Sequence, residues 1–163
     1  MLIKEAKEIV GGLSDASKMP ESSYNLDARN CITGAKLVKV KGSVCAGCYA
    51  LKGNYMRYAA VGIAQARRLE RLANPKWVEA MATLTEKQQY FRWFDSGDIQ
   101  SLSMLIKIVA VAMLNPATSY WLPTKEYKIV STYRKQGGIE PKNLVIRVSA
   151  PMINQRLSDV YGT

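Results

Sequence analysis

A chain of 163 residues is long enough to fold around its own hydrophobic core, and we predict a single domain over residues 1–163. With 48% hydrophobic and 22% charged residues, the composition excludes a mainly disordered chain. The longest apolar run, residues 105–114, is well short of the roughly 20 residues that span a bilayer, so we expect no membrane segment. The net charge of +10 favours an anionic partner, such as a small anionic substrate or a cofactor-linked acyl group. Nucleic acid is a less favoured partner, and a basic surface that only confers solubility is the alternative.

Short apolar runs alternate with helical patterns along the chain. An amphipathic pattern predicts an N-terminal helix over residues 1–13, packed on the rest of the domain. The remaining patterns predict strands over 37–41, 89–94, 119–122 and 144–149, and helices over 55–73, 75–84, 101–114 and 125–135. Strands that alternate with helices are typical of βα units. We therefore predict an α/β fold with a mostly parallel sheet.

Polar residues follow each predicted strand. The carboxyl ends of parallel strands lie along one edge of the sheet, which we call the carboxyl edge, and α/β proteins bind their ligands there. The residues that follow the four strands are, in chain order, Cys45 and Cys48; Asp95, Ser96 and Asp98; Lys125 and Glu126; and Ser149. We expect the cysteine loop to face the other polar residues across a single cleft at the carboxyl edge.

All three cysteines, Cys31, Cys45 and Cys48, lie within 18 residues, and the chain has no histidine. A structural zinc site needs four nitrogen or sulfur ligands, which this chain cannot supply. The odd count, and the reducing cytoplasm in which we expect the protein, disfavour disulfides. A [4Fe–4S] cluster suits three cysteines, because thiolates can hold three irons and leave the fourth iron open. The alternative is three buried cysteines that act as small hydrophobic residues.

Two acidic segments offer candidate catalytic residues. Asp95 or Asp98 could act as a general base or as the fourth iron ligand, with Ser96 as a nucleophile. The alternative is that Asp98 or Ser101 caps the helix that follows. Lys125 could bind an anionic group, and Glu126 is a carboxylate in the first turn of a predicted helix. Without histidine, Ser-His-Asp and Cys-His catalysis are excluded.

Candidate substrate-binding residues come from the strands. Arg147 interrupts an apolar strand, so it either meets an acid across the cleft or lies at an edge of the sheet. Ser149 at the end of that strand could donate a hydrogen bond to the cluster or the substrate. Trp93 and Trp121 occupy similar positions in neighbouring strands. They could stack on a substrate, although most such aromatic residues belong to a core.

Four segments resemble the phage gene product 88 family. They are Cys45–Ala50, Phe91–Ile99, Tyr120–Glu126 and Asn143–Ser149, and the resemblance extends over about Tyr24 to Pro151. It implies a viral protein of bacteriophage origin, in the cytoplasm of an infected bacterial host, and it supports a cysteine-bound iron–sulfur cluster. Longer members continue into a further cysteine-containing segment that this chain lacks, which favours an open or non-cysteine fourth position.

Together these features predict a metal-binding [4Fe–4S] protein with three cysteine ligands and an open iron. As a Lewis acid, that iron could support the hydrolysis of an ester or thioester. Three alternatives remain: a non-enzymatic redox or sensor protein, a radical-SAM-like enzyme, and a nucleic-acid-binding protein with a structural metal. Radical chemistry ranks lower because its usual cysteine spacing is C-x3-C-x2-C, whereas this chain has C-x13-C-x2-C.

Overall fold

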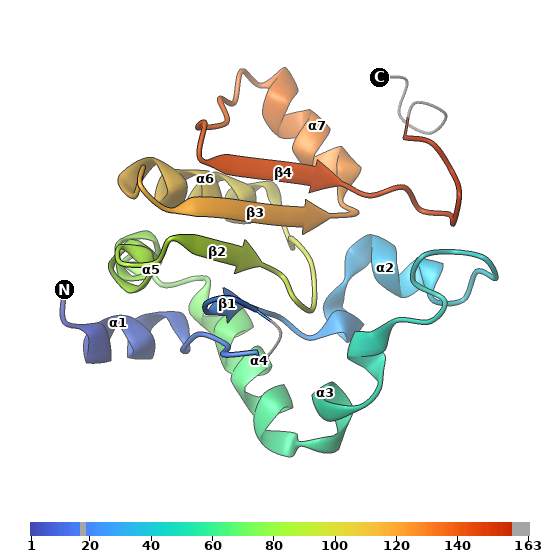
Figure 1. Ribbon diagram of the computed structural model, residues 1–163, viewed down its shortest axis with the longest axis horizontal. Coiled ribbons are helices and arrows are strands. Elements are labelled where there is room, and N and C mark those ends of the chain that lie inside the picture. Colours follow the sequence, from blue (N-terminus) through green and yellow to red (C-terminus); the bar gives the residue numbers. More distant parts are fainter. Residues whose placement is uncertain (17–18, 158–163) are drawn as a thin grey trace.

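The chain forms a four-stranded, all-parallel sheet flanked by helices (Figure 1), which confirms the predicted α/β class. The computed structural model describes residues 1–16 and 19–157. The strands are β1 (Ser23–Tyr24), β2 (Tyr90–Trp93), β3 (Ser119–Thr124) and β4 (Leu144–Val148). The helices are α1 (Ile3–Val10), α2 (Ile32–Leu37), α3 (Asn54–Arg57), α4 (Ala59–Arg71), α5 (Trp77–Thr85), α6 (Leu102–Leu114) and α7 (Tyr127–Lys135), with short 3-10 turns η1 (Ala28–Asn30) and η2 (Tyr49–Leu51). Within the described ranges, no helix is long and apolar enough to cross a membrane.

The strands lie in the order β1-β2-β3-β4, so each crossover connects neighbouring strands. Because crossovers between parallel strands are right-handed, a sheet that always advances in one direction places its connecting helices on one face. Figure 1 shows α6 behind the sheet, on the side away from the viewer. Phe91, Trp93, Tyr120 and Leu122 point to this helical side and are almost completely buried.

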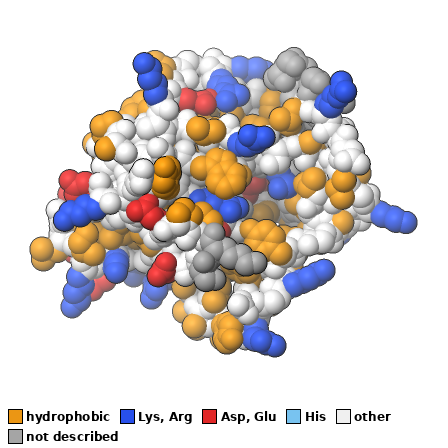
Figure 2. Space-filling view, viewed as in Figure 1, with side chains coloured by type: hydrophobic (Ala, Val, Ile, Leu, Met, Phe, Trp, Pro, Cys, Tyr) orange, Lys and Arg blue, Asp and Glu red, His pale blue; other side chains and the backbone are white. Residues whose placement is uncertain are grey.

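The opposite face of the sheet is exposed. Tyr90 is 49%, Trp121 41% and Val145 57% exposed, and Arg92 and Arg147 occupy alternate positions on the same strands. These five residues define what we call the open face, which faces the viewer in Figures 1 and 2. The described residues therefore form two layers, and none of their helices covers this face of the parallel sheet.

Aromatic residues make up the centre of the core. The rings of Phe91 and Trp93 lie 4.9 Å apart in an edge-to-face arrangement, and Trp93 stacks on Tyr120 at 6.3 Å. Tyr24 from β1 meets Trp77 of α5 edge-to-face at 5.7 Å. The Tyr24 hydroxyl donates a hydrogen bond to the Arg68 carbonyl at 2.9 Å. These contacts join the short first strand to the helices that cover it.

The predicted strand over 37–41 is wrong. Residues Ile32–Leu37 form α2, and a turn with an exposed Val40 follows. An alternating pattern becomes a strand only where another strand can pair with it. The edge next to β2 is occupied by β1, whose two residues are too short to give a recognisable pattern.

The predicted helix over 55–73 is two helices. Tyr58 has extended backbone angles (φ −102°, ψ 112°) and separates α3 from α4. The other predicted strands and helices are present, with ends that shift by a few residues. α1, for example, ends at Val10 because Gly11 adopts a left-handed conformation with φ 83°.

Candidate functional site

The predicted polar residues meet at the carboxyl edge of the sheet. β2 runs into Asp95–Asp98, β3 ends at Thr124, and β4 is followed by Ser149, whose amide donates to the Thr124 carbonyl at 2.8 Å. Figure 1 shows α2 and the cysteine-containing segment beyond the same ends of the strands. The cysteines reach this edge through the turn after β1 rather than from a strand over 37–41.

The Cys31 and Cys45 sulfurs lie close to Gly34. Cys31 directly precedes α2, and Gly34 is buried in that helix. A side-chain carbon at Gly34 would lie 3.6 Å from the Cys31 sulfur and 3.7 Å from the Cys45 sulfur. Cys48 belongs to the same turn as Cys45, because its amide donates to the Cys45 carbonyl at 3.1 Å. Two sulfurs therefore face the same space, which a residue larger than glycine would fill.

The surroundings of the cysteines are electronegative. Burial raises the pKa of the Cys31 thiol to about 12, and the negative charge of Asp98, the other two cysteines and Glu126 add to this effect. Burial also raises the pKa of Cys45, while the charge of Lys125 opposes the rise. Thiolates here would be stabilised by a cation.

The side chains around the cysteines are not arranged as a complete metal site. Among residues 1–16 and 19–157, no group of three cysteine, aspartate or glutamate side chains is arranged to hold a metal ion. All three cysteines are free thiols. Three soft donors in electronegative surroundings nevertheless have the chemistry that an iron–sulfur cluster requires, and cysteine side chains can rotate to meet it.

Asp98 links the β2–α6 loop to the end of β3. It accepts hydrogen bonds from Thr124 Oγ1 at 2.6 Å, from the Lys125 amide at 2.9 Å and from the Ile99 amide at 2.8 Å. Burial raises the pKa of Asp98 to about 6, although these hydrogen bonds favour the charged form. Ser101 caps α6 instead, with its Oγ accepting from the Met104 amide at 3.1 Å. Asp98 is thus a buried carboxyl that could exchange a proton near neutral pH.

Asp95 is a buried junction between the sheet and the α3 region. It accepts hydrogen bonds from Ser23 Oγ at 2.8 Å, Asn25 Nδ2 at 3.1 Å and Tyr55 Oη at 2.7 Å. The Ser96 hydroxyl donates a hydrogen bond to the Leu26 carbonyl at 2.9 Å, and Ser96 is 4% exposed. These contacts favour structural roles for Asp95 and Ser96 over the roles of base and nucleophile.

The loop that carries these residues turns sharply. Phe94 and Gly97 both have left-handed backbones, with φ 55° and φ 80°. A side-chain carbon at Gly97 would lie 2.7 Å from Leu26 Cβ and 2.8 Å from the Leu26 carbonyl oxygen. Glycine is therefore required at position 97 for both its conformation and its lack of a side chain.

Glu126 attaches the end of β3 to the cysteine segment. Its two carboxylate oxygens accept hydrogen bonds from the Thr33 amide and from Thr33 Oγ1, both at 2.8 Å. Glu126 itself is 5% exposed and stands at the start of α7, where Thr124 Oγ1 accepts its amide hydrogen bond at 3.0 Å. Thr33 is two residues from Cys31, so this contact positions the first cysteine. The sequence contains no signal that pairs these two residues.

The two tryptophans point to opposite faces of the sheet. Trp121 pairs with Arg92 in the β2–β3 register, so Trp93, one residue further on, points the other way. Trp93 is fully buried in the core, which leaves no surface for a substrate. Trp121 is exposed on the open face, and Arg147 is exposed on the edge strand β4, as expected for an unpaired charge.

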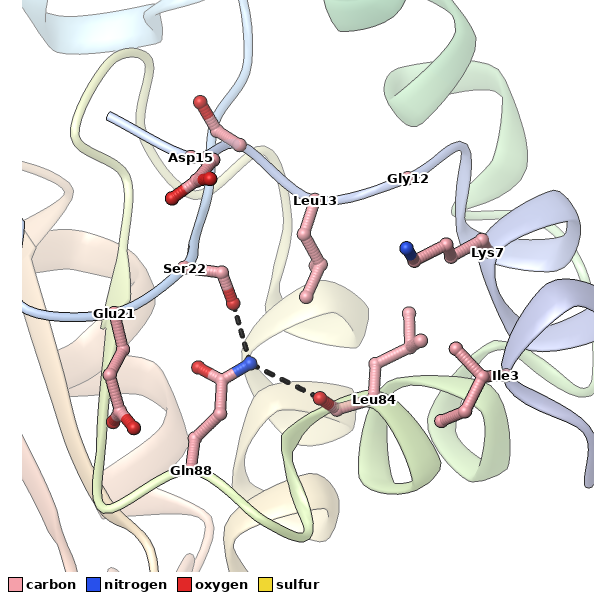
Figure 3. A pocket seen from close by; sticks show the side chains of 10 residues that line it. Ile3, Lys7, Gly12, Leu13, Asp15, Glu21, Ser22, Leu84 and Gln88 are labelled. Carbon is pink, nitrogen blue, oxygen red and sulfur yellow. Dashed lines mark hydrogen bonds between the residues drawn. The ribbon is translucent and has the colours of Figure 1, made fainter. Parts of the chain in front are cut away.

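A separate cavity of about 550 Å³ lies at the amino ends of the strands (Figure 3). It is lined by side chains from α1, from residues 12–15 and from the end of α5, with Asp15, Glu21 and Lys7 around it. The Gln88 amide nitrogen donates to Ser22 Oγ at 2.5 Å and to the Leu84 carbonyl at 3.1 Å. Because parallel sheets bind ligands at their carboxyl ends, the cysteine segment at that edge remains the candidate site.

Comparison with known proteins identifies one family. The family model of Gene product 88 matches residues 2–162, almost the whole chain, and agrees with the resemblance of the four segments to phage proteins of that name. Searches of curated proteins and of solved structures gave no match. The match extends through the strands and the cysteine segment alike, and the chain belongs to the Gene product 88 family.

Proposed function

We propose that this protein binds a [4Fe–4S] cluster through Cys31, Cys45 and Cys48. The observation that carries the proposal is the convergence of the Cys31 and Cys45 sulfurs beside Gly34, at the carboxyl edge of a parallel sheet. Cys48 lies in the same turn as Cys45, so its sulfur could reach a ligand that the other two sulfurs share. Three thiolates would leave one iron without a cysteine, since the chain has no fourth cysteine and no histidine.

The negative charge around Cys31 and Cys45 supports a cationic centre. Cys31 is partly buried beside Asp98 and Glu126, and negative charge and burial both raise the pKa of its thiol. An iron centre would offset this accumulation of negative charge and stabilise the thiolates. Lys125 is the positive side chain whose charge acts on Cys45, and it alone would compensate only in part.

For the reaction, we propose the hydrolysis of an ester or thioester with an anionic tail. An open iron would supply Lewis acidity to a carbonyl or a water molecule. Asp98 is better placed than Asp95 to hold the proton, because burial raises its pKa to about 6 and its charge acts on Cys31 and Cys45. Lys125 would bind the anionic group of the substrate. We place this activity in the cytoplasm of the infected bacterial cell.

A redox or sensor role is the second candidate, and it too follows from the position of Asp98. If this carboxylate were to occupy the fourth iron permanently, the cluster could not bind a substrate and would store an electron or report oxygen or iron status instead.

The first experiment is anaerobic purification followed by iron and sulfide analysis and EPR of the reduced protein, with and without added thioester and carboxylate ligands. About four irons and four sulfides per chain, with a spectrum that responds to the ligands, would support an open cluster. A spectrum that does not respond would favour the redox role. Zinc or no metal would refute the cluster.

Three variants test the ligands. Cys31→Ser, Cys45→Ser and Cys48→Ser should each lose most of the iron. Met113→Ser is the matched control, because it removes an exposed sulfur from α6 and should leave the iron content unchanged. Full iron content in any cysteine variant would remove that residue from the ligand set.

A further inference from the structure

The open face is unusual for a parallel sheet. Parallel sheets occur almost always with both faces covered, because their connecting helices pack on both sides. Here one face carries exposed Tyr90, Trp121 and Val145 from three adjacent strands. Single exposed apolar residues are ordinary, but a contiguous group of this kind marks a binding surface.

A groove crosses this face. It encloses about 530 Å³ between the strands and the segment Met19–Ser22, a volume within the range of sites for small aromatic molecules. Tyr90, Arg92 and Trp121 line it from the sheet, and Met19 lines it from the segment. Figure 2 shows hydrophobic and basic side chains side by side on this surface. The groove could therefore hold a flat aromatic group.

The strands of this face carry positive charge and no acidic side chain. The Arg92 guanidinium lies 4.7 Å from the centre of the Trp121 ring, and its Nε is buried without a hydrogen-bond partner. The ion pairs of the described residues are Arg29–Asp27 and Arg134–Glu140, so neither Arg92 nor Arg147 has an acidic partner there. The acid at the groove is Glu21, and one of its oxygens accepts the Tyr90 amide hydrogen bond at 2.5 Å.

We propose that the open face binds single-stranded nucleic acid. Bases would stack on Trp121 and Tyr90, and Arg92 and Arg147 would contact the phosphates. Exposed aromatic residues interleaved with arginines on a sheet are the arrangement that holds unpaired bases, because every base presents a π-face for stacking. The net charge of +10 favours the same polyanion.

A second copy of the chain fits this face less well. A symmetric dimer would bring the same patch together with itself, and so would place the arginines of one copy against those of the other. No outward-facing residue of β2, β3 or β4 is acidic, so such an interface would have no compensating charge from the strands. A duplex would also conceal the faces of its bases from Trp121. The inference uses no cysteine and is independent of the proposed cluster.

The test is fluorescence anisotropy of a labelled oligothymidylate of about 20 nucleotides, at about 50 mM salt, with a duplex of equal length as competitor. Trp121→Ala should weaken binding by about tenfold to a hundredfold, the effect of losing one stacked base. Tyr58→Ala, which removes an exposed aromatic residue next to α4, is the matched control and should change the affinity less than about twofold. Arg147→Gln should lower the slope of log affinity against log salt by about one, whereas the surface control Lys4→Gln should change it less.

Tryptophan fluorescence provides an independent readout. Trp77 and Trp93 are fully buried, so quenching by a stacked base should come from Trp121. Trp121→Phe should retain binding and lose most of the quenching. Protein freed of metal with a chelator under reducing conditions should bind the oligonucleotide like the untreated protein, which separates this inference from the cluster proposal.

Four outcomes would overturn the proposal. They are no binding of the single strand at low salt, preference for the duplex, equal losses in the Trp121→Ala and Tyr58→Ala proteins, and a dimer in analytical ultracentrifugation that Trp121→Ala dissociates. The last result would assign the open face to a second copy of the chain.

Discussion

The hydrogen bonds between Glu126 and Thr33 should determine both the stability of the α2 region and the retention of iron. One carboxylate joins the end of β3 to the turn that carries Cys31, through two hydrogen bonds of 2.8 Å. A hydrogen bond to a charged group contributes about 1.5–3 kcal/mol. Glu126→Ala removes both bonds, but water can reach the freed groups because Thr33 is only partly buried. We therefore expect a loss of about 3 kcal/mol in the free energy of unfolding.

Substitutions at Thr33 divide this effect. Thr33→Val removes the hydroxyl bond and keeps the amide bond, so it should cost about 1.5 kcal/mol, while Thr33→Ser should cost less than about 0.5 kcal/mol. A double-mutant cycle of Glu126→Ala with Thr33→Val should give a coupling of about 1–2 kcal/mol. The assay is urea unfolding under anaerobic, reducing conditions with a chelator, so that stability is measured without metal. The same variants are then loaded with iron and sulfide, and the least stable variant should retain the least iron.

A stabilising role of these hydrogen bonds would be refuted if Glu126→Ala unfolded at the urea concentration of the unaltered protein, or if Thr33→Val and Thr33→Ser changed the free energy of unfolding equally. Normal iron content in a clearly destabilised Glu126→Ala protein would support the contribution of the hydrogen bonds to stability and refute only their role in positioning Cys31.

Three further predictions concern the same edge of the sheet and use urea unfolding as the measurement. Gly97→Ala should lower the free energy of unfolding by about 3 kcal/mol, because it adds a steric overlap to the strain of a left-handed backbone. The control is Gly12→Ala, at φ 84° with free space around it, which should lower it by only about 1 kcal/mol. Equal losses would contradict the overlap. Burial raises the pKa of Asp98 from 3.8 to about 6, so the folded state binds this proton more tightly than the unfolded state. The contribution of Asp98 to the free energy of unfolding is then complete below about pH 4, and about 3 kcal/mol of it is lost as the pH rises through 6. The metal-free Asp98→Asn protein should lack this dependence of stability on pH. An unchanged dependence would assign it to another group. Tyr55→Phe should cost about 1.5 kcal/mol through the lost hydrogen bond to the buried Asp95, and a neutral effect would show that water replaces the hydroxyl.

Local patterns were sufficient for the elements that have them. β2, β3 and β4 are apolar segments between clear turn residues. α6 ends at Leu114, next to Asn115, and α7 ends at Lys135, two residues before Gly137. Such signals act within a few residues of the chain, so they can be read without knowing the partners. Once the sheet was predicted to be parallel, the common edge of Asp98, Glu126 and Ser149 followed from geometry alone. The placement of these residues was therefore predictable, whereas their hydrogen-bond partners were not.

Only the tertiary structure decided which side chains are free to act. Asp95 resembles a candidate base in the sequence, but donors from residues 40 to 72 positions away occupy it in the fold. Trp93 and Trp121 look equivalent, yet a register that places Trp121 opposite Arg92 buries the first and exposes the second. The sequence by itself determined β2, β3 and β4, most of the helices and the edge at which the polar residues meet, because these depend on short-range periodicity, whereas it missed β1 and predicted a strand over 37–41 that is not there. Register, long-range hydrogen bonds and the uncovered face depend on how distant segments pack, and the folded chain alone determines them.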